Sequence, residues 1–334
     1  MGQAGPTRRS TGTRRERRCH GAGGVSAAAA GNGATCTVRV PATTANLGPG
    51  FDCLGLALDL WNDTRFSLEG DGVVVTARGE RSETLPTGAT NLVARSFLRL
   101  CVEAGVAAPA GLRIDCEVRV PLSSGLGSSS AAIVAGLLGA NTLLGRPLDR
   151  ARLLELAADI EGHPDNVAAA LLGGLTIVVR NGHKLLTKKI LVPEVHVALA
   201  VPRLDFSTRA ARAGLPTEVS MKDAVFNLGR TPLVVEALRT GDYELLSQVM
   251  EDRLHQASRL KLIPGGPEAW LAAQHAGAVA VAVSGSGPSL IAFVSLATDA
   301  SRLAREMTEA FSRMGVTAIP LGLSASAAGA TVAA

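Results

Sequence analysis

The chain is poor in aromatic residues. Phe, Trp and Tyr make up 3% of its 334 residues, whereas 47% of the residues are hydrophobic. A buried core must therefore be built mainly from Ala, Val and Leu. Few rings remain for stacking on nucleic-acid bases, which argues against a protein that binds single strands.

Cysteine pairs and long apolar runs are also missing. The five cysteines are odd in number and form no Cys-x-x-Cys pair, which argues against a disulfide framework or a zinc site and fits a reducing compartment. No apolar run reaches the roughly 18 residues of a membrane span. We therefore expect no membrane partner and a cytoplasmic location.

The basic character of the chain is confined to its beginning. Residues 1–34 carry six arginines and one glutamate, so the net charge of +4 leaves −1 for the other 300 residues. The body of the protein is thus no general polyanion binder. The basic tail lacks periodicity and is predicted to be disordered. Three interpretations stay open: a transit peptide, which would make the location a plastid, a nucleic-acid-binding arm, or an extension from a mis-assigned start codon.

Strand and helix patterns alternate through the rest of the chain. Strands are expected at 36–40, 73–77, 112–120, 195–201, 278–283, 290–294 and 316–321. Helices are expected at 91–103, 129–144, 150–160, 224–235, 243–254 and 302–314. This interleaving favours an α/β or α+β fold. A polar stretch at 180–189 indicates a boundary between domains at 35–190 and 191–330.

The most informative motif is the segment 121–132, which reads PLSSGLGSSSAA between an expected strand and an expected helix. A loop at that place exposes backbone N–H groups beside the positive end of a helix dipole, which suits a polyphosphate. Its hydroxyls can also ligate Mg²⁺. It lacks the Gly-Lys-Ser/Thr of a Walker A loop and the third glycine of a Rossmann fingerprint. Taken by itself, the segment is equally well read as an ordinary glycine-rich turn.

Four further segments, 41–52, 161–167, 207–216 and 284–289, are rich in small polar residues. Together with the serine-rich loop they resemble the GHMP kinases, a family of small-molecule ATP kinases. The strings ANLGPGFD, HPDNV and STRAARAGLP are similar to the branch of that family that acts on homoserine. The resemblance implies an α+β fold of two domains, with an N-terminal domain like the second domain of ribosomal protein S5 and a ferredoxin-like C-terminal domain.

The resemblance implies ATP and Mg²⁺ as cofactors. The loop would bind the phosphates of ATP through Pro121, Leu122, Ser123, Ser124, Gly125, Leu126, Gly127, Ser128, Ser129, Ser130 and Ala131. Asn91 would lie near the adenine. Ser129 would ligate Mg²⁺ with Glu155 as its carboxylate partner, although the third serine of the run leaves Ser128 and Ser130 as alternatives. Without the family spacing, Glu155 reads as a residue of a solvated helix face.

The resemblance also implies the acceptor site. Arg212 and Arg259 would bind a carboxylate, which a guanidinium recognises with two parallel hydrogen bonds. The same pocket would contain Asn46 and Asp52 around the hydroxyl. Asp165 and Asn166 would contact the amino group and the hydroxyl end, and Thr208 would lie near the transferred phosphoryl group. Asp165, Asn166 and Thr208 are thus the predicted catalytic residues, with no base assigned, whereas His163 is expected to support Asp165.

These roles amount to ATP-dependent phosphorylation of L-homoserine to O-phospho-L-homoserine, in threonine biosynthesis. A kinase of the same family for mevalonate or a sugar is the nearest alternative. A non-catalytic sensor would be expected to lose Ser129 or Glu155, and both are present. A nucleic-acid-binding protein would depend on the tail alone. Family members are often dimers, so a homodimer is implied, but the sequence shows no interface.

Overall fold

The computed structural model describes Gly2 and residues 33–333, apart from the side chains of Thr208 and Ala210. The predictions for the basic tail therefore fall almost entirely outside the described residues. Within the described part, no helix combines the length and the hydropathy that a membrane crossing needs.

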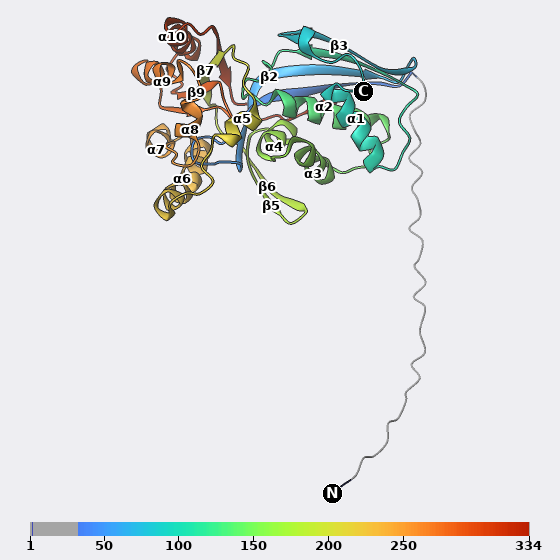
Figure 1. The fold of residues 1–334 in the computed structure, drawn as a ribbon, viewed down its shortest axis with the longest axis horizontal. Coiled ribbons are helices and arrows are strands. Elements are labelled where there is room, and N and C mark those ends of the chain that lie inside the picture. The colour runs from blue at the N-terminus through green and yellow to red at the C-terminus, as the bar shows by residue number, and fades with distance from the viewer. Residues whose placement is uncertain (1, 3–32, 334) are drawn as a thin grey trace.

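The first half of the chain builds a mixed sheet with helices on one face (Figure 1). Its strands, seven in the described residues, are β1 (Thr35–Ala45), β2 (Leu54–Ser67), β3 (Gly72–Gly79), β4 (Gly111–Val118), β5 (Leu175–Asn181), β6 (Lys184–Ile190) and β11 (Thr331–Ala333). The strand order is β11-β1-β2-β4-β3, and β5 pairs with the other end of β2 and with β6. Strands β3 and β4 are parallel, and the other pairs are antiparallel.

Four α-helices cover this sheet: α1 (Leu92–Glu103), α2 (Ser128–Leu143), α3 (Arg150–Glu161) and α4 (Asp165–Leu172). A 3₁₀ turn at Ser82–Thr84 precedes them. Helix α2 packs on β1 and against the other three helices, and eleven of its 16 residues are buried. The Asp149 side chain accepts a hydrogen bond from Arg152 N and caps α3, which confirms the predicted start of that helix.

The second half builds an antiparallel sheet. Its order is β10-β7-β9-β8 in the described residues, with β7 (His196–Pro202), β8 (Ala280–Val283), β9 (Leu290–Val294) and β10 (Ala318–Ser324). The accompanying helices are α5 (Thr208–Ala213), α6 (Met221–Thr240), α7 (Tyr243–Val249), α8 (Gln256–Leu260), α9 (Gly266–His275) and α10 (Ala300–Arg313). Helices α9 and α10 pack on one face of this sheet around a core of small and aliphatic residues.

One apolar core joins the two sheets. It combines Leu54, Leu56 and Leu58 of β2 with Leu199 of β7 and Phe293 of β9, all fully buried. The pairing of β1 with β2 shifts register between Pro41 and Ala42, and such a bulge bends the strands that carry it. The end of β2 that carries Leu54, Leu56 and Leu58 packs against the second sheet, so the two halves share buried surface.

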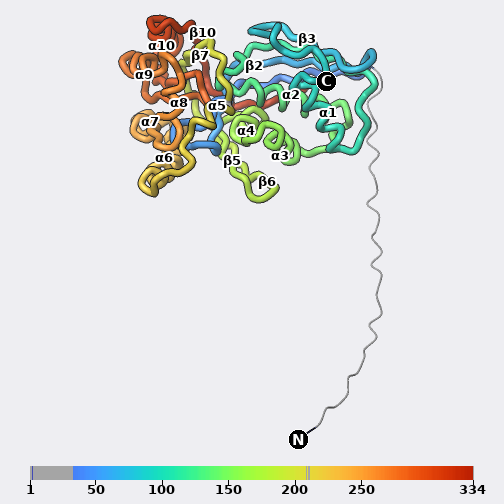
Figure 2. The backbone as a smooth tube through the Cα atoms, in the orientation of Figure 1, coloured from blue at the N-terminus to red at the C-terminus, as the bar shows by residue number. Residues whose placement is uncertain are grey.

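The chain also returns to its starting sheet at the end. Strand β11 pairs with β1, and Figure 2 shows the C-terminal end beside the strands of the first sheet. The polar stretch 180–189 forms a hairpin from β5 and β6. The helix expected at 243–254 ends at Val249, and α4, α5, α8 and α9 were not expected from the sequence. The predicted α+β class is confirmed.

The shared core yields a stability prediction. Leu199→Ala should lower the free energy of unfolding by about 2–5 kcal/mol, because it leaves a cavity in fully buried packing. Leu271→Ala, the same change at a side chain that is 53% exposed on α9, should cost about 0.5 kcal/mol or less. Urea unfolding of both variants measures this, and similar losses would contradict a shared core.

Candidate active site

Two cavities lie on either side of the serine-rich loop. The smaller, of about 60 Å³, is bounded by the loop and by the turns at 161–166 and 285–287, and its lining includes all six side chains that the sequence assigned to the acceptor. The larger, of about 290 Å³, is more apolar and is lined in part by Leu85, Asn91, Val93, Val118, Leu122 and Ala132. Ser123, Ser128 and Ser129 border both cavities, so one loop connects them.

The loop requires glycine at two positions. Gly125 and Gly127 have φ of 82° and 69°, a region that costs other residues free energy. A Cβ on Gly125 would lie 2.3 Å from the Ser284 carbonyl oxygen, and one on Gly127 would lie 2.0 Å from Thr43 Oγ1. Helix α2 begins directly after Gly127, so its first turn leaves backbone N–H groups without helical acceptors at the cavities.

The C-terminal turn at 284–289 locks the loop in place. Ser284 Oγ donates to Gly125 O at 2.8 Å, and Ser289 N donates to Ser124 O at 3.1 Å. Gly285 N donates to Ala45 O at 3.2 Å. Three segments that are distant in sequence, at Ala45, at 124–125 and at 284–289, thus meet around one site.

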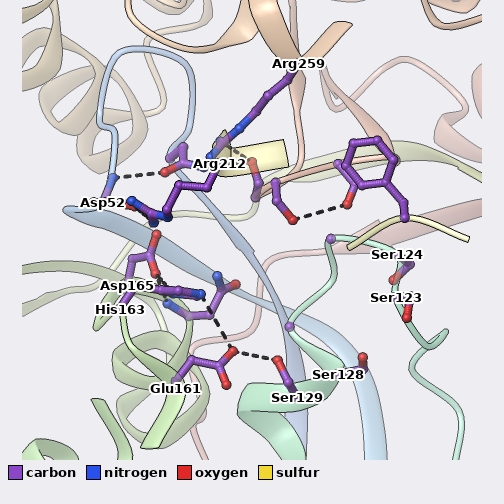
Figure 3. Close-up of a pocket in the computed structure, with 18 residues that line it drawn as sticks. Asp52, Ser123, Ser124, Ser128, Ser129, Glu161, His163, Asp165, Arg212 and Arg259 are labelled. Carbon is purple, nitrogen blue, oxygen red and sulfur yellow. Dashed lines mark hydrogen bonds and ion pairs between the residues drawn. The ribbon is translucent and has the colours of Figure 1, made fainter. Parts of the chain in front are cut away.

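The structure corrects the acidic partner of Ser129. Ser129 Oγ donates to Glu161 Oε1 at 2.5 Å (Figure 3). Ser130 Oγ donates to the same oxygen at 2.9 Å. Glu155 instead pairs with Arg152 at 2.9 Å on α3 and does not line the smaller cavity. The reason is that only the C-terminal end of α3 reaches the loop. Glu161 is the first residue of the motif Glu-Gly-His-Pro-Asp-Asn. Its place in that motif was the feature of the sequence that could have identified it as the acid beside the loop.

The turn after Glu161 presents a buried carboxylate. Asp165 begins α4 and is 2% exposed. Its Oδ1 accepts hydrogen bonds from Asn166 N at 2.8 Å and from His163 Nδ1 at 2.7 Å. Burial acts to lower the pKa of His163, but the hydrogen bond to Asp165 and the surrounding carboxylates raise it above its ordinary value. The expected support of Asp165 by His163 is confirmed, and Asn166 Oδ1 accepts from Thr43 Oγ1.

Arg212 and Asp52 form a two-pronged ion pair at the rim of the same cavity. The guanidinium nitrogens lie 2.7 and 2.8 Å from the two carboxylate oxygens, and the hydrogen bond raises the pKa of Arg212. Asn46 supports this loop: its Oδ1 accepts from Asp52 N, and its Nδ2 donates to Gly285 O at 2.8 Å. The Asn46 side chain is therefore already engaged in holding the backbone.

Arg259 is the buried cation of the site, with 2% of its surface exposed. One terminal nitrogen donates to Gly285 O at 2.7 Å and faces His255 Nδ1 at 3.1 Å. Its Nε has no hydrogen-bond partner in the described part of the chain. Burial lowers the pKa of Arg259 to about 10, against the opposing influence of Asp52 and Asp165. The group therefore stays charged at neutral pH.

Two predicted residues lie at the edges of this arrangement. Asn91 caps α1, with Oδ1 accepting from Val93 N and Nδ2 donating to Pro86 O, and it lines the larger cavity. Thr208 begins α5, but its side chain falls outside the described residues, so its role stays a prediction.

Comparisons with known proteins agree with this geometry. The chain matches the GHMP kinases N terminal domain over residues 91–174 and the GHMP kinases C terminal domain over 234–313. A homoserine kinase from Moorella thermoacetica is 43% identical over 280 residues, 84% of this chain and 93% of that protein. One from Synechococcus sp. (strain WH7803) is 47% identical over 268 residues, 79% and 85% of the two chains.

Among solved structures, a homoserine kinase from Cytophaga hutchinsonii matches with a TM-score of 0.79 and 32% identity, over 90% of this chain and 97% of that one. The two-sheet fold and the matches to both family domains define a GHMP kinase. Within that class, the chain belongs to the homoserine kinase family.

The loop geometry yields a second prediction. Gly127→Ala should raise KM for ATP by about tenfold or more, because a Cβ cannot fit beside Thr43 without moving the loop. Gly105→Ala is the matched control, since Gly105 has a similar φ of 67° and nothing within 4 Å of the new Cβ. Steady-state kinetics with varied ATP measures both, and equal effects would show that positive φ alone is responsible.

Proposed function

We propose that this protein transfers the γ-phosphoryl group of ATP to the side-chain hydroxyl of L-homoserine, giving O-phospho-L-homoserine in threonine biosynthesis. The observation that carries the proposal is the smaller cavity. There a buried arginine and an ion-paired arginine face two carboxylates within reach of the serine-rich loop. An amino acid presents the complementary charges, with one carboxylate and one ammonium group. Mevalonate has no ammonium group, and a sugar has neither.

The larger cavity suits the adenosine part of ATP. Its lining is mostly apolar and it opens onto the serine-rich loop, so a nucleotide there would direct its phosphates toward the first turn of α2. Backbone N–H groups at a helix N-terminus bind phosphate oxygens well. The Asn91 side chain would help to shape this cavity around the nucleotide. Its amide group already makes the hydrogen bonds that cap α1.

The acceptor would lie in the smaller cavity with its carboxylate at the two arginines. Arg259 holds an unused Nε there, and Arg212 can exchange its intramolecular partner Asp52 for the substrate carboxylate. Asp52, thus released, and Asp165 are the anions available for the substrate ammonium group. The hydroxyl would then point toward the loop, beside Asn166 and Thr208.

The reaction forms a bond from the homoserine oxygen to the γ-phosphorus and breaks the bond from that phosphorus to the β-phosphate bridging oxygen. ADP leaves, and the hydroxyl proton is lost. Such transition states are loose, so positioning and charge neutralisation supply most of the catalysis. Asp165 Oδ1 already accepts two hydrogen bonds, which is why we assign it to positioning and name no side-chain base.

The donor set around Glu161 fits Mg²⁺. Two serine hydroxyls converge on one carboxylate oxygen, and Mg²⁺ favours hard oxygen ligands, with phosphates and water completing its shell. Glu161, Ser129 and Ser130 would hold the ion. When bound, Mg²⁺ neutralises charge on the β- and γ-phosphates.

Further parts of the proposal concern organisation and location. We place the division between the two domains at residue 190, where β6 ends before β7 begins at His196. A cytoplasmic location and a homodimer complete the proposal. Gel filtration with light scattering measures the oligomeric state.

The proposed reaction predicts a narrow acceptor range. A coupled assay that measures ADP should detect its release with MgATP and L-homoserine. It should be near background with mevalonate, L-serine, L-threonine, galactose or no acceptor. Turnover confined to a different acceptor would leave the ATP site in place but overturn the substrate assignment.

The arginine pair predicts a selective defect. Arg212→Ala should raise KM for homoserine about 100-fold, because one charged partner of the carboxylate is lost, while KM for ATP changes little. Arg209→Ala, an exposed arginine of the same helix, is the matched control and should behave like the wild type. Steady-state kinetics with each substrate varied distinguishes them, and equal KM values would remove Arg212 from the site.

The corrected acid predicts a contrast between two glutamates. Glu161→Gln should lower kcat about 100-fold or more and raise the Mg²⁺ concentration needed for half-maximal rate, because an anionic ligand is lost. Glu155→Gln should stay near the wild-type rate, since it weakens only the partly exposed pair with Arg152, which lies outside the smaller cavity. Mg²⁺ titrations of the rate measure both. The reverse pattern would restore Glu155 as the ligand.

A further inference from the structure

The carboxylate-binding arginines share a buried support that the reaction itself does not use. The His255 side chain is fully buried. Its Nε2 lies 2.8 Å from Gly48 O. Because a backbone carbonyl can only accept, Nε2 carries the proton and Nδ1 is left as an acceptor. That acceptor faces the terminal nitrogen of Arg259 at 3.1 Å.

Burial keeps this histidine neutral, since it lowers the pKa of His255 to about 4 despite the nearby Asp252. The ring therefore offers a lone pair to Arg259 at neutral pH. The Asp252 carboxylate also fixes the backbone beneath the ring, because it accepts from the N–H groups of Leu254, His255 and Gln256. The histidine is thus held independently of any substrate.

Phe51 connects the same ring to both arginines. The Phe51 and His255 rings are stacked with centroids 5.0 Å apart. The guanidinium carbons of Arg259 and Arg212 lie 5.2 and 5.5 Å from the Phe51 centroid, within the range of cation–π contacts. Phe51 also precedes Asp52, the partner of Arg212. His255 therefore contacts Arg259 directly and is connected to Arg212 only through Phe51.

We infer that His255 is a positioning residue for acceptor binding, which acts by accepting a hydrogen bond from Arg259 and so orienting that guanidinium toward the substrate carboxylate. This inference rests on the proposed function. A guanidinium has several rotamers of similar energy, and burial by itself does not select among them. The Gly285 carbonyl and the His255 lone pair together define one orientation that leaves Nε free for the ligand.

Two substitutions separate the contacts of the ring. In His255→Asn, the amide oxygen occupies roughly the place of Nδ1 and can still accept from Arg259, while the bond to Gly48 is lost. In His255→Gln, the amide nitrogen occupies roughly the place of Nε2 and can still donate to Gly48, while the acceptor for Arg259 is lost. His255→Ala removes both contacts.

The test measures kcat and KM for homoserine and for ATP in the wild type and these three variants, with thermal unfolding of each. We expect His255→Gln and His255→Ala to raise KM for homoserine about tenfold, as for the loss of one hydrogen bond to a charged group. KM for ATP and kcat should change less than about threefold. His255→Asn should restore KM for homoserine close to the wild-type value, whatever its melting temperature. His196→Gln, far from the cavity on β7 and paired with Glu194, should match the wild type.

Other outcomes overturn the inference. Equal KM defects in His255→Asn and His255→Gln would mean that the ring acts only by filling space, and a defect confined to kcat or to KM for ATP would mean that it does not act through Arg259. Absence of homoserine turnover in the wild type would overturn the proposed function and this inference together. Wild-type turnover with unchanged KM in all variants would overturn the inference alone.

Discussion

The site depends on a close approach of backbone to backbone. The serine-rich loop passes so near the turn at 284–289 that Gly125 has no room for a side chain, and hydrogen bonds from Ser284 and Ser289 join the two segments. The loop belongs to the first sheet and the turn to the second. These hydrogen bonds fix the loop directly before α2, so the first turn of that helix lies between the two cavities.

Charge balance is the second constraint on the site. Arg259 is almost fully buried, and an isolated buried cation would be costly. The nearby carboxylates of Asp52 and Asp165 offset part of that cost through their charge, without a direct ion pair to Arg259 among the described contacts. In the free protein, Asp52 is engaged in an ion pair with Arg212. A zwitterionic acceptor can enter such a cluster by exchanging partners, and the net charge of the site is unchanged by its arrival.

The sequence predicted the fold class and most of the strands because alternation and apolar runs are local properties. It also located the serine-rich loop between β4 and α2, since glycine and serine between a strand and a helix have a local physical reason. It did not predict α4, α5, α8 or α9. Helix α8 is only five residues long, and α4 is apolar through most of its length, so neither shows an amphipathic period. The sequence analysis chose Glu155 instead of Glu161 as the partner of Ser129, because that contact depends on which end of α3 meets the loop.

By itself, the sequence determined which chemical groups are present: two arginines for a carboxylate, acidic and amide groups for an ammonium and a hydroxyl, and a loop for phosphates. Tertiary structure alone decided which of them meet. It placed Glu161 at the serines, engaged Asn46 in holding backbone, paired Arg212 with Asp52 and set His255 behind Arg259. The physical reason for the first three is that they join residues 32 to 239 positions apart in the chain. His255 and Arg259 are only four residues apart, but their orientations depend on Gly48 and Gly285, which are distant in sequence. The long-range distances depend on the irregular pairing of β1 with β2, in which Asp59 and Leu60 of β2 have no partner in β1, and on the core shared between the sheets. No local pattern records either.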